Sequence, residues 1–150
     1  MIAKRIAFYI FIVLGIAVLS NSQDRRSGDF ETLEGTWNIV TTPTGTQVLA
    51  TYSRGGTLTA DGNVASPGPC HGVWKRLSYL DFSSTCERFD FDAAGNWVGR
   101  TEYRQSIRVS SNLEEFSGRV QFRVFDRLDT PRTTGEGTLQ GTRVNVKAIQ

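Results

Sequence analysis

The chain has 150 residues, a length typical of one domain, and 39% hydrophobic and 21% charged residues, as in an ordinary globular protein. Its formal charge is +2, and without Lys4 and Arg5 the basic and acidic residues are equal at 15 each. A near-neutral domain has no general electrostatic attraction for nucleic acid or an anionic membrane, so we expect neither as a partner.

The first residues have the pattern of a secretory signal peptide. Lys4 and Arg5 form a basic start, and residues 6–19 form an uncharged apolar run. We therefore expect a signal peptide over residues 1–20, cleaved near residues 20–22, a flexible polar linker over 21–32 and a folded domain over 33–150. The alternative is an uncleaved anchor, although the run is short for a spanning helix. The predicted location is periplasmic or extracellular, without a stable membrane anchor after cleavage.

From Gly35 onward, short alternating runs separated by turn sequences predict an all-β domain. We expect a second strand that divides into two if the chain bends at Gly55-Gly56. A meander of sequential hairpins leaves exposed edges unless it closes. The sequence therefore predicts an antiparallel up-and-down β-barrel of seven or eight strands, with a two-sheet sandwich as the alternative. The expected strands are 35–42, 47–60, 70–77, 79–92, 97–110, 115–127 and 134–148.

Two hairpins can be aligned from their cross-strand pairs. A turn centred on Ser78 places Cys70 opposite Cys86 and Trp74 opposite Phe82. A hairpin that turns through residues 111–114 places Tyr103 opposite Phe122.

The hairpin between these two turns at residues 93–95, with Gly95 at the position that needs a positive φ. This alignment places Phe91 opposite Trp97 and Phe89 opposite Gly99. Because the apolar face of residues 79–92 changes parity after Cys86, we expect a β-bulge near residues 87–88.

The first predicted strand starts with Gly35-Thr36-Trp37, and the last contains Gly141-Thr142-Arg143-Val144. A Gly-x-Trp on the first strand with an Arg on the last resembles the lipocalin family and the wider calycin superfamily. The resemblance implies that Trp37 plugs the closed end of a barrel and that Arg143 packs across its ring, as a cation–π contact would. The chain is also similar to small exported bacterial proteins of uncharacterised function.

Cys70 and Cys86 are the only cysteines. An exported chain meets an oxidising compartment, and the predicted hairpin places the two cysteines opposite each other. Both observations favour a disulfide. Two buried free thiols or a reactive pair are the alternatives.

Candidate catalytic groups are few. His71 is the only histidine, and a surface position is the more ordinary interpretation of it. No His, Asp or Glu spacing typical of a metal site occurs, and no P-loop, dinucleotide fingerprint or Gly-x-Ser-x-Gly motif is present. We therefore expect no metal, cofactor or catalytic residue.

The predicted interior combines aromatic walls with a few polar groups, as small-molecule sites in barrels do. An eight-stranded barrel is only just wide enough for side chains or for one small ligand, so a filled core is the alternative. The main hypothesis is a barrel that binds a small, largely apolar molecule, hydrogen-bonded by Tyr103 or Gln105. The others are a non-catalytic envelope or secreted interaction protein with a filled barrel and, less favoured because no acid or base is expected to point inward, a barrel isomerase. The candidate cavity residues are Trp74, Phe82, Trp97, Tyr103, Gln105, Phe122 and Gln140.

Overall fold

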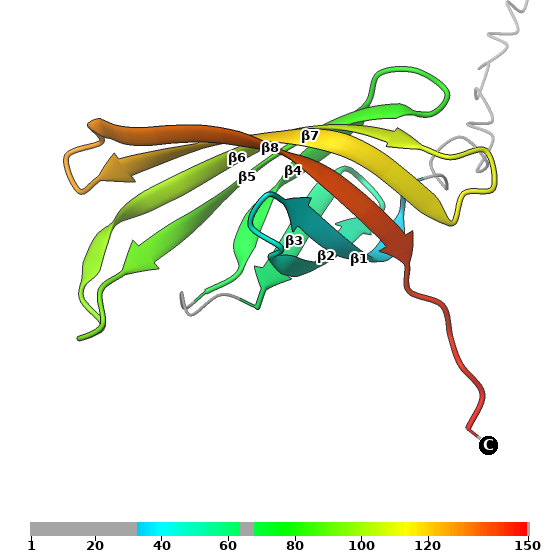
Figure 1. Ribbon diagram of the computed structural model, residues 1–150, viewed down its shortest axis with the longest axis horizontal. Coiled ribbons are helices and arrows are strands. Elements are labelled where there is room, and N and C mark those ends of the chain that lie inside the picture. Colours follow the sequence, from blue (N-terminus) through cyan, green and yellow to red (C-terminus); the bar gives the residue numbers. More distant parts are fainter. Residues whose placement is uncertain (1–32, 64–67, 150) are drawn as a thin grey trace, which may run out of the picture.

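The computed structural model describes residues 33–63 and 68–149, and these form a closed, antiparallel, up-and-down β-barrel (Figure 1). Each strand pairs with the next, and β1 pairs with β8 to close the barrel. The predicted all-β barrel is confirmed, with eight strands. They are β1 (Gly35–Thr42), β2 (Gln47–Ser53), β3 (Thr57–Gly62), β4 (Cys70–Arg76), β5 (Asp81–Phe91), β6 (Trp97–Val109), β7 (Glu115–Asp126) and β8 (Pro131–Arg143).

The predictions for the N-terminal residues cannot be compared with the barrel. The signal peptide at 1–20 and the linker at 21–32 lie outside the described residues. Over residues 33–63 and 68–149, no helix has the length and apolar character needed to cross a membrane.

The eighth strand arises from the bend at Gly55-Gly56. These glycines have φ values of 92° and 88°, a region that residues with a Cβ rarely adopt. A Cβ on Gly56 would also lie 2.9 Å from the backbone oxygen of Trp74. The predicted second strand is therefore divided into β2 and β3.

One half of the barrel is filled by a packed apolar layer. Trp37 is fully buried, its Nε1 donates a hydrogen bond to the Leu33 carbonyl at 2.9 Å, and its ring lies 4.9 Å from that of Phe116. The Tyr52 and Trp74 rings meet edge to face at 6.3 Å, and the Trp74 and Phe82 rings lie 5.9 Å apart. This layer gives the barrel a solid end.

Arg143 covers this end. Its guanidinium carbon lies 4.2 Å from the centroid of the Trp37 ring. Its Nε donates to the Leu113 carbonyl at 2.8 Å, and its Nη1 donates to the Glu34 carbonyl at 2.6 Å. Partial burial lowers the pKa of the Arg143 guanidinium, opposed by the negative charge of Glu114. The contact ties β8 to the start of β1 and to the β6–β7 turn.

The predicted β6–β7 pairing is confirmed, with Tyr103 opposite Phe122 and Val109 opposite Phe116. The β4–β5 pairing differs from the prediction by two residues, because Gly72 lies opposite Cys86 and Trp74 opposite Ser84. The turn sits later in the chain, since both Leu77 and Ser78 donate backbone hydrogen bonds to the Asp81 carbonyl. A shift of two residues keeps every side chain on its predicted face.

The predicted disulfide forms despite this shift. Cys70 and Cys86 lie diagonally across β4 and β5 with their Cα atoms 5.7 Å apart. Gly72 makes the approach possible, because a Cβ there would lie 2.5 Å from the Cβ of Cys86. The disulfide is consistent with an exported protein.

The bulge predicted near residues 87–88 is wrong. The β5–β6 register shifts at Asp90/Phe91 instead, and the predicted pairing of Phe89 with Gly99 is replaced by Asp90 with Gly99. The predicted pair of Phe91 and Trp97 is confirmed. Inward alternation therefore continues along β5 to Arg88 and Asp90, whereas Phe89 is 63% exposed.

Two long hairpins, β5–β6 and β7–β8, extend past the other strands to one side, at the left in Figure 1. No β4 residue pairs with β5 beyond Glu87, and no β1 residue pairs with β8 before Thr138. These hairpins form a sheet that continues one wall of the barrel.

Candidate functional site

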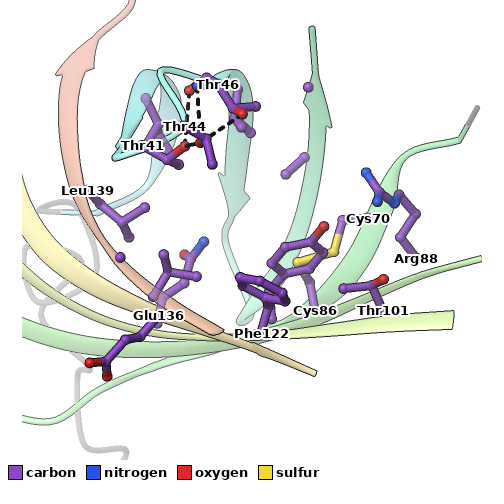
Figure 2. A pocket seen from close by; sticks show the side chains of 18 of the residues that line it. Thr41, Thr44, Thr46, Cys70, Cys86, Arg88, Thr101, Phe122, Glu136 and Leu139 are labelled. Atoms are coloured by element: carbon purple, nitrogen blue, oxygen red, sulfur yellow. Dashed lines mark hydrogen bonds between the residues drawn. A yellow bond between two sulfur atoms is a disulfide. The ribbon is translucent and has the colours of Figure 1, made fainter. Parts of the chain in front are cut away.

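The other half of the barrel is hollow. A cavity of about 580 Å³ is lined by residues from all eight strands, within the usual range of small-molecule sites (Figure 2). The packed layer lies at the Trp37 end, where neither Trp37 nor Phe116 lines the cavity. The barrel therefore has a packed core at one end and an open cavity at the other.

Most of the cavity wall is apolar. The aliphatic side chains of Ile39, Val48, Val120 and Leu139 line it, together with the ring of Phe122. Ile39, Val120 and Leu139 are each less than 10% exposed. These surfaces can bury an apolar ligand without leaving polar groups unpaired.

A buried hydrogen-bond network lies beside the packed layer. The Oε1 of Gln105 accepts hydrogen bonds from the Tyr52 hydroxyl at 3.1 Å and from the Ser84 hydroxyl at 2.8 Å. Tyr52 and Ser84 are 1% and 2% exposed, whereas Gln105 lines the cavity. Burial raises the pKa of the Tyr52 phenol, and the neighbouring Ser84 hydroxyl opposes that shift, so the phenol stays neutral.

A second polar group lies on the wall formed by β5 and β6. The Nε and Nη2 of Arg88 each lie 3.2 Å from the Oδ1 of Asp90, and the Thr101 hydroxyl donates to Oδ2 at 2.6 Å. The Arg88 guanidinium lies 5.7 Å from the centroid of the Tyr103 ring. Burial raises the pKa of the Tyr103 phenol, and the positive charge of Arg88 opposes that shift. Arg88, Thr101 and Tyr103 all line the cavity.

Threonines at the β1–β2 turn form part of the cavity rim. The Thr44 hydroxyl oxygen lies 2.7 Å from that of Thr41 and accepts a hydrogen bond from the Thr46 hydroxyl at 3.0 Å (Figure 2). Thr41 also donates to the Thr46 carbonyl at 3.4 Å. These hydroxyls satisfy one another, so this part of the rim is already paired.

The disulfide is also part of the cavity wall, since both Cys70 and Cys86 line it. It fixes the start of β4 against β5.

The structure brings three of the seven candidate cavity residues together. Tyr103, Gln105 and Phe122 line the cavity, and the Tyr103 and Phe122 rings lie 6.4 Å apart. Trp74 and Phe82 belong to the packed layer and do not line it.

The other two candidates lie on the outside. Trp97 is 43% exposed and meets Phe89 edge to face at 6.4 Å, because the register shift in β6 moves it out of the inward series. Gln140 is exposed, and its neighbours Leu139 and Gly141 occupy the buried positions of β8. Trp97 and Gln140 therefore lie on the opposite face from the one predicted.

The sequence predictions do not include Arg88, Asp90 and Thr101 as a linked group. They place no acid or base on the inner faces, because the two phenylalanines after Arg88 favour a change of parity there. Strict alternation from Phe82 through Ser84 and Cys86 would have placed Arg88 and Asp90 inside. Their pairing with each other offsets the cost of taking two charges into the barrel.

The other candidate catalytic or metal-binding side chains do not come together in a site. His71 is exposed on β4. Among residues 33–63 and 68–149, no three His, Cys, Asp or Glu side chains come together as metal ligands would. The cavity instead offers apolar walls with a few oriented hydrogen-bonding groups.

None of the protein families, curated proteins or solved structures compared with this chain matches it. What the chain does must therefore be derived from its barrel and its cavity.

Proposed function

We propose that the chain is an exported, lipocalin-like barrel that binds a small, largely apolar molecule in its cavity. The observation that carries this proposal is the hollow half of the barrel, about 580 Å³ in volume and walled mainly by aliphatic and aromatic side chains. A barrel that served only as a rigid structural unit could fill both halves, as this one fills the Trp37 end. Apolar surface facing an open cavity gains free energy when a ligand removes it from water.

Filling the cavity tests the proposal. Val120 lines the cavity and is 8% exposed, so Val120→Phe places a ring in the space that a ligand would take. The disulfide-intact protein would be titrated with a neutral apolar fluorescent dye, and we expect Val120→Phe to weaken dye binding at least tenfold. The matched control is Val73→Phe on β4, where Val73 is 61% exposed and outside the cavity.

Equal binding by Val120→Phe and the unchanged protein would place the dye elsewhere and overturn the proposal. Native mass spectrometry of gently purified exported protein gives an independent measurement. An adduct of a few hundred daltons, lost on denaturation, is the expected result.

A second candidate function is interaction through the outer surface, and the exposed aromatic residues on the β5–β6 hairpin favour it. Phe89 is 63% exposed and Trp97 43% exposed, and their rings are in contact. A stable oligomer that dissociates in the Phe89→Ser variant, measured by light scattering, would support this alternative.

A further inference from the structure

The side-chain amide of Gln105 is held at its oxygen. Two buried hydroxyls, those of Tyr52 and Ser84, both donate to its Oε1. A carbonyl oxygen has two lone pairs, so this end of the amide is fully used. The opposite end, Nε2, must then point away from both hydroxyls.

Nε2 has no hydrogen-bond acceptor within the part of the chain that the structure describes, and Gln105 lines the cavity. An amide nitrogen carries two donors and no acceptor. The cavity therefore contains a hydrogen-bond donor that is held in place by the protein but unpaired by it.

The carboxylates near the cavity, by contrast, do not present themselves to a ligand. Both carboxylate oxygens of Asp90 accept hydrogen bonds, one from Arg88 and one from Thr101. Glu136 lines the rim, but it is exposed, and Figure 2 shows its carboxylate directed away from the other cavity side chains. A ligand entering the cavity therefore meets the spare donor of Gln105 without meeting a free carboxylate.

The charged side chains on this wall are paired with each other. Arg88 carries the positive charge on the cavity wall, and the Asp90 carboxylate lies 3.2 Å from it. An anionic ligand would have to compete with Asp90 for Arg88, whereas a neutral acceptor can bind at Gln105 and leave the ion pair intact.

We propose that the cavity selects a neutral molecule with an apolar body and one carbonyl-type oxygen, which accepts a hydrogen bond from Nε2 of Gln105. This inference rests on the proposed ligand-binding function and names the chemical class of that ligand. The buried Tyr52 and Ser84 hydroxyls act as positioning groups that present the donor.

A series of ligands of equal chain length tests the inference on the unchanged protein. A long-chain methyl ketone, the matching alkane, carboxylate and primary amine would each displace the fluorescent dye. We expect the ketone to bind about tenfold more tightly than the alkane, the value of one net hydrogen bond, and more tightly than the amine or the carboxylate.

The Gln105→Glu variant separates the donor from its anchor. It keeps an oxygen for Tyr52 and Ser84 but replaces the donor nitrogen by a second oxygen. We expect it to lose the ketone preference when the carboxylate is ionised and to regain it when the carboxyl is protonated, over a range of about pH 5 to 9. The unchanged protein, measured over the same range, controls for Arg88, Asp90 and Tyr103, and Gln140→Glu is the matched exposed control.

Three outcomes would overturn the inference while leaving the proposed function in place. They are equal affinity for ketone and alkane, tightest binding of the carboxylate, and a Gln105→Glu variant that keeps the ketone preference at every pH. If no member of the series and no dye binds, the proposed function itself fails, and this inference fails with it.

Discussion

Gly72 marks a close approach between β4 and β5. A Cβ built on this residue would lie 2.1 Å from the Thr85 backbone oxygen and 2.5 Å from the Cys86 Cβ. Neither neighbour is the end of a flexible side chain, so neither can move aside without shifting β5. The absence of a side chain at Gly72 is therefore required by the close approach of β4 to β5 beside the disulfide.

We expect Gly72→Ala to destabilise the fold by about 3 kcal/mol, at the upper end of the usual cost of overpacking. The measurement is denaturant unfolding of the oxidised protein. Gly62→Ala is the control, because the nearest atoms to a Cβ there lie at 3.6 Å, which is ordinary contact. Equal unfolding midpoints for the two variants would show that β5 can accommodate the methyl group.

Asp92 and Asp126 close the two projecting hairpins in the same way. The Oδ1 of Asp92 accepts backbone hydrogen bonds from Ala94 at 2.9 Å and from Asn96 at 2.8 Å. The Oδ1 of Asp126 accepts from residues 128 and 130 at 2.9 Å. The backbone donors at Asn96 and at residue 130 are the main cause that lowers the pKa of each carboxyl.

A lowered carboxyl pKa makes the folded state less stable in acid. The contribution of these two groups is fully present above their unfolded pKa of about 3.9 and is lost as the pH falls through their lower folded values. We expect the unchanged protein to be more stable than the Asp92→Asn/Asp126→Asn variant near neutral pH, with the difference disappearing as the pH falls below about 4. Urea unfolding at a series of pH values measures this, with Asp61→Asn on β3 as the control; a constant difference at every pH would contradict it.

Strand β5 shows where sequence patterns stop being informative. The β6–β7 pairing follows from alternation alone, because Tyr103, Ile107 and Val109 on β6 alternate with arginine and serine residues, and β7 has the same pattern. On β5 the apolar residues Phe89 and Phe91 lie on the outside, whereas Arg88 and Asp90 lie inside and pair with each other. Simple alternation from Phe82 agrees with this placement, but the two phenylalanines favour the opposite face. The contacts that decide between the two faces are made by Thr101 and Tyr103 of the next strand, so β5 alone leaves the choice open.

The disulfide is the covalent link between β4 and β5. It joins residues 16 apart in sequence, and closing a loop of this length stabilises a fold by about 3 kcal/mol in the chain-entropy model. We expect the Cys70→Ser/Cys86→Ser variant to lose about this amount in denaturant unfolding. The oxidised protein should carry no alkylatable thiol and should be two hydrogens lighter than the reduced form. Unfolding that is unchanged by reductant would contradict the prediction.

The whole barrel divides into two halves along its axis. Trp37, Phe116 and Arg143 close one end, and the cavity bounded by Val120 and Gln105 opens at the other. Closure and strand order follow from the sequence. Which half stays hollow does not, because it depends on how side chains from all eight strands share the interior.

This division predicts that stability and binding respond to different substitutions. Arg143→Met removes the cation–π contact with Trp37 and the hydrogen bonds to two backbone carbonyls, and we expect a loss of about 2 kcal/mol in stability. The folded variant should bind the dye with unchanged affinity, because Arg143 lies outside the cavity lining. Thermal unfolding and dye titration on one sample test both halves of this statement. A weakened dye affinity in the folded variant would show that the two ends are coupled.

The solid end of the barrel also bears on how such a protein can change over generations. Most substitutions lower stability, and a chain is lost only when it falls below the threshold needed to stay folded. Here the residues that hold the fold and the residues that face a ligand are largely different sets. Substitutions around the cavity can therefore accumulate without lowering the stability that the packed end provides. One barrel can be adapted to new ligands in small, individually tolerated steps.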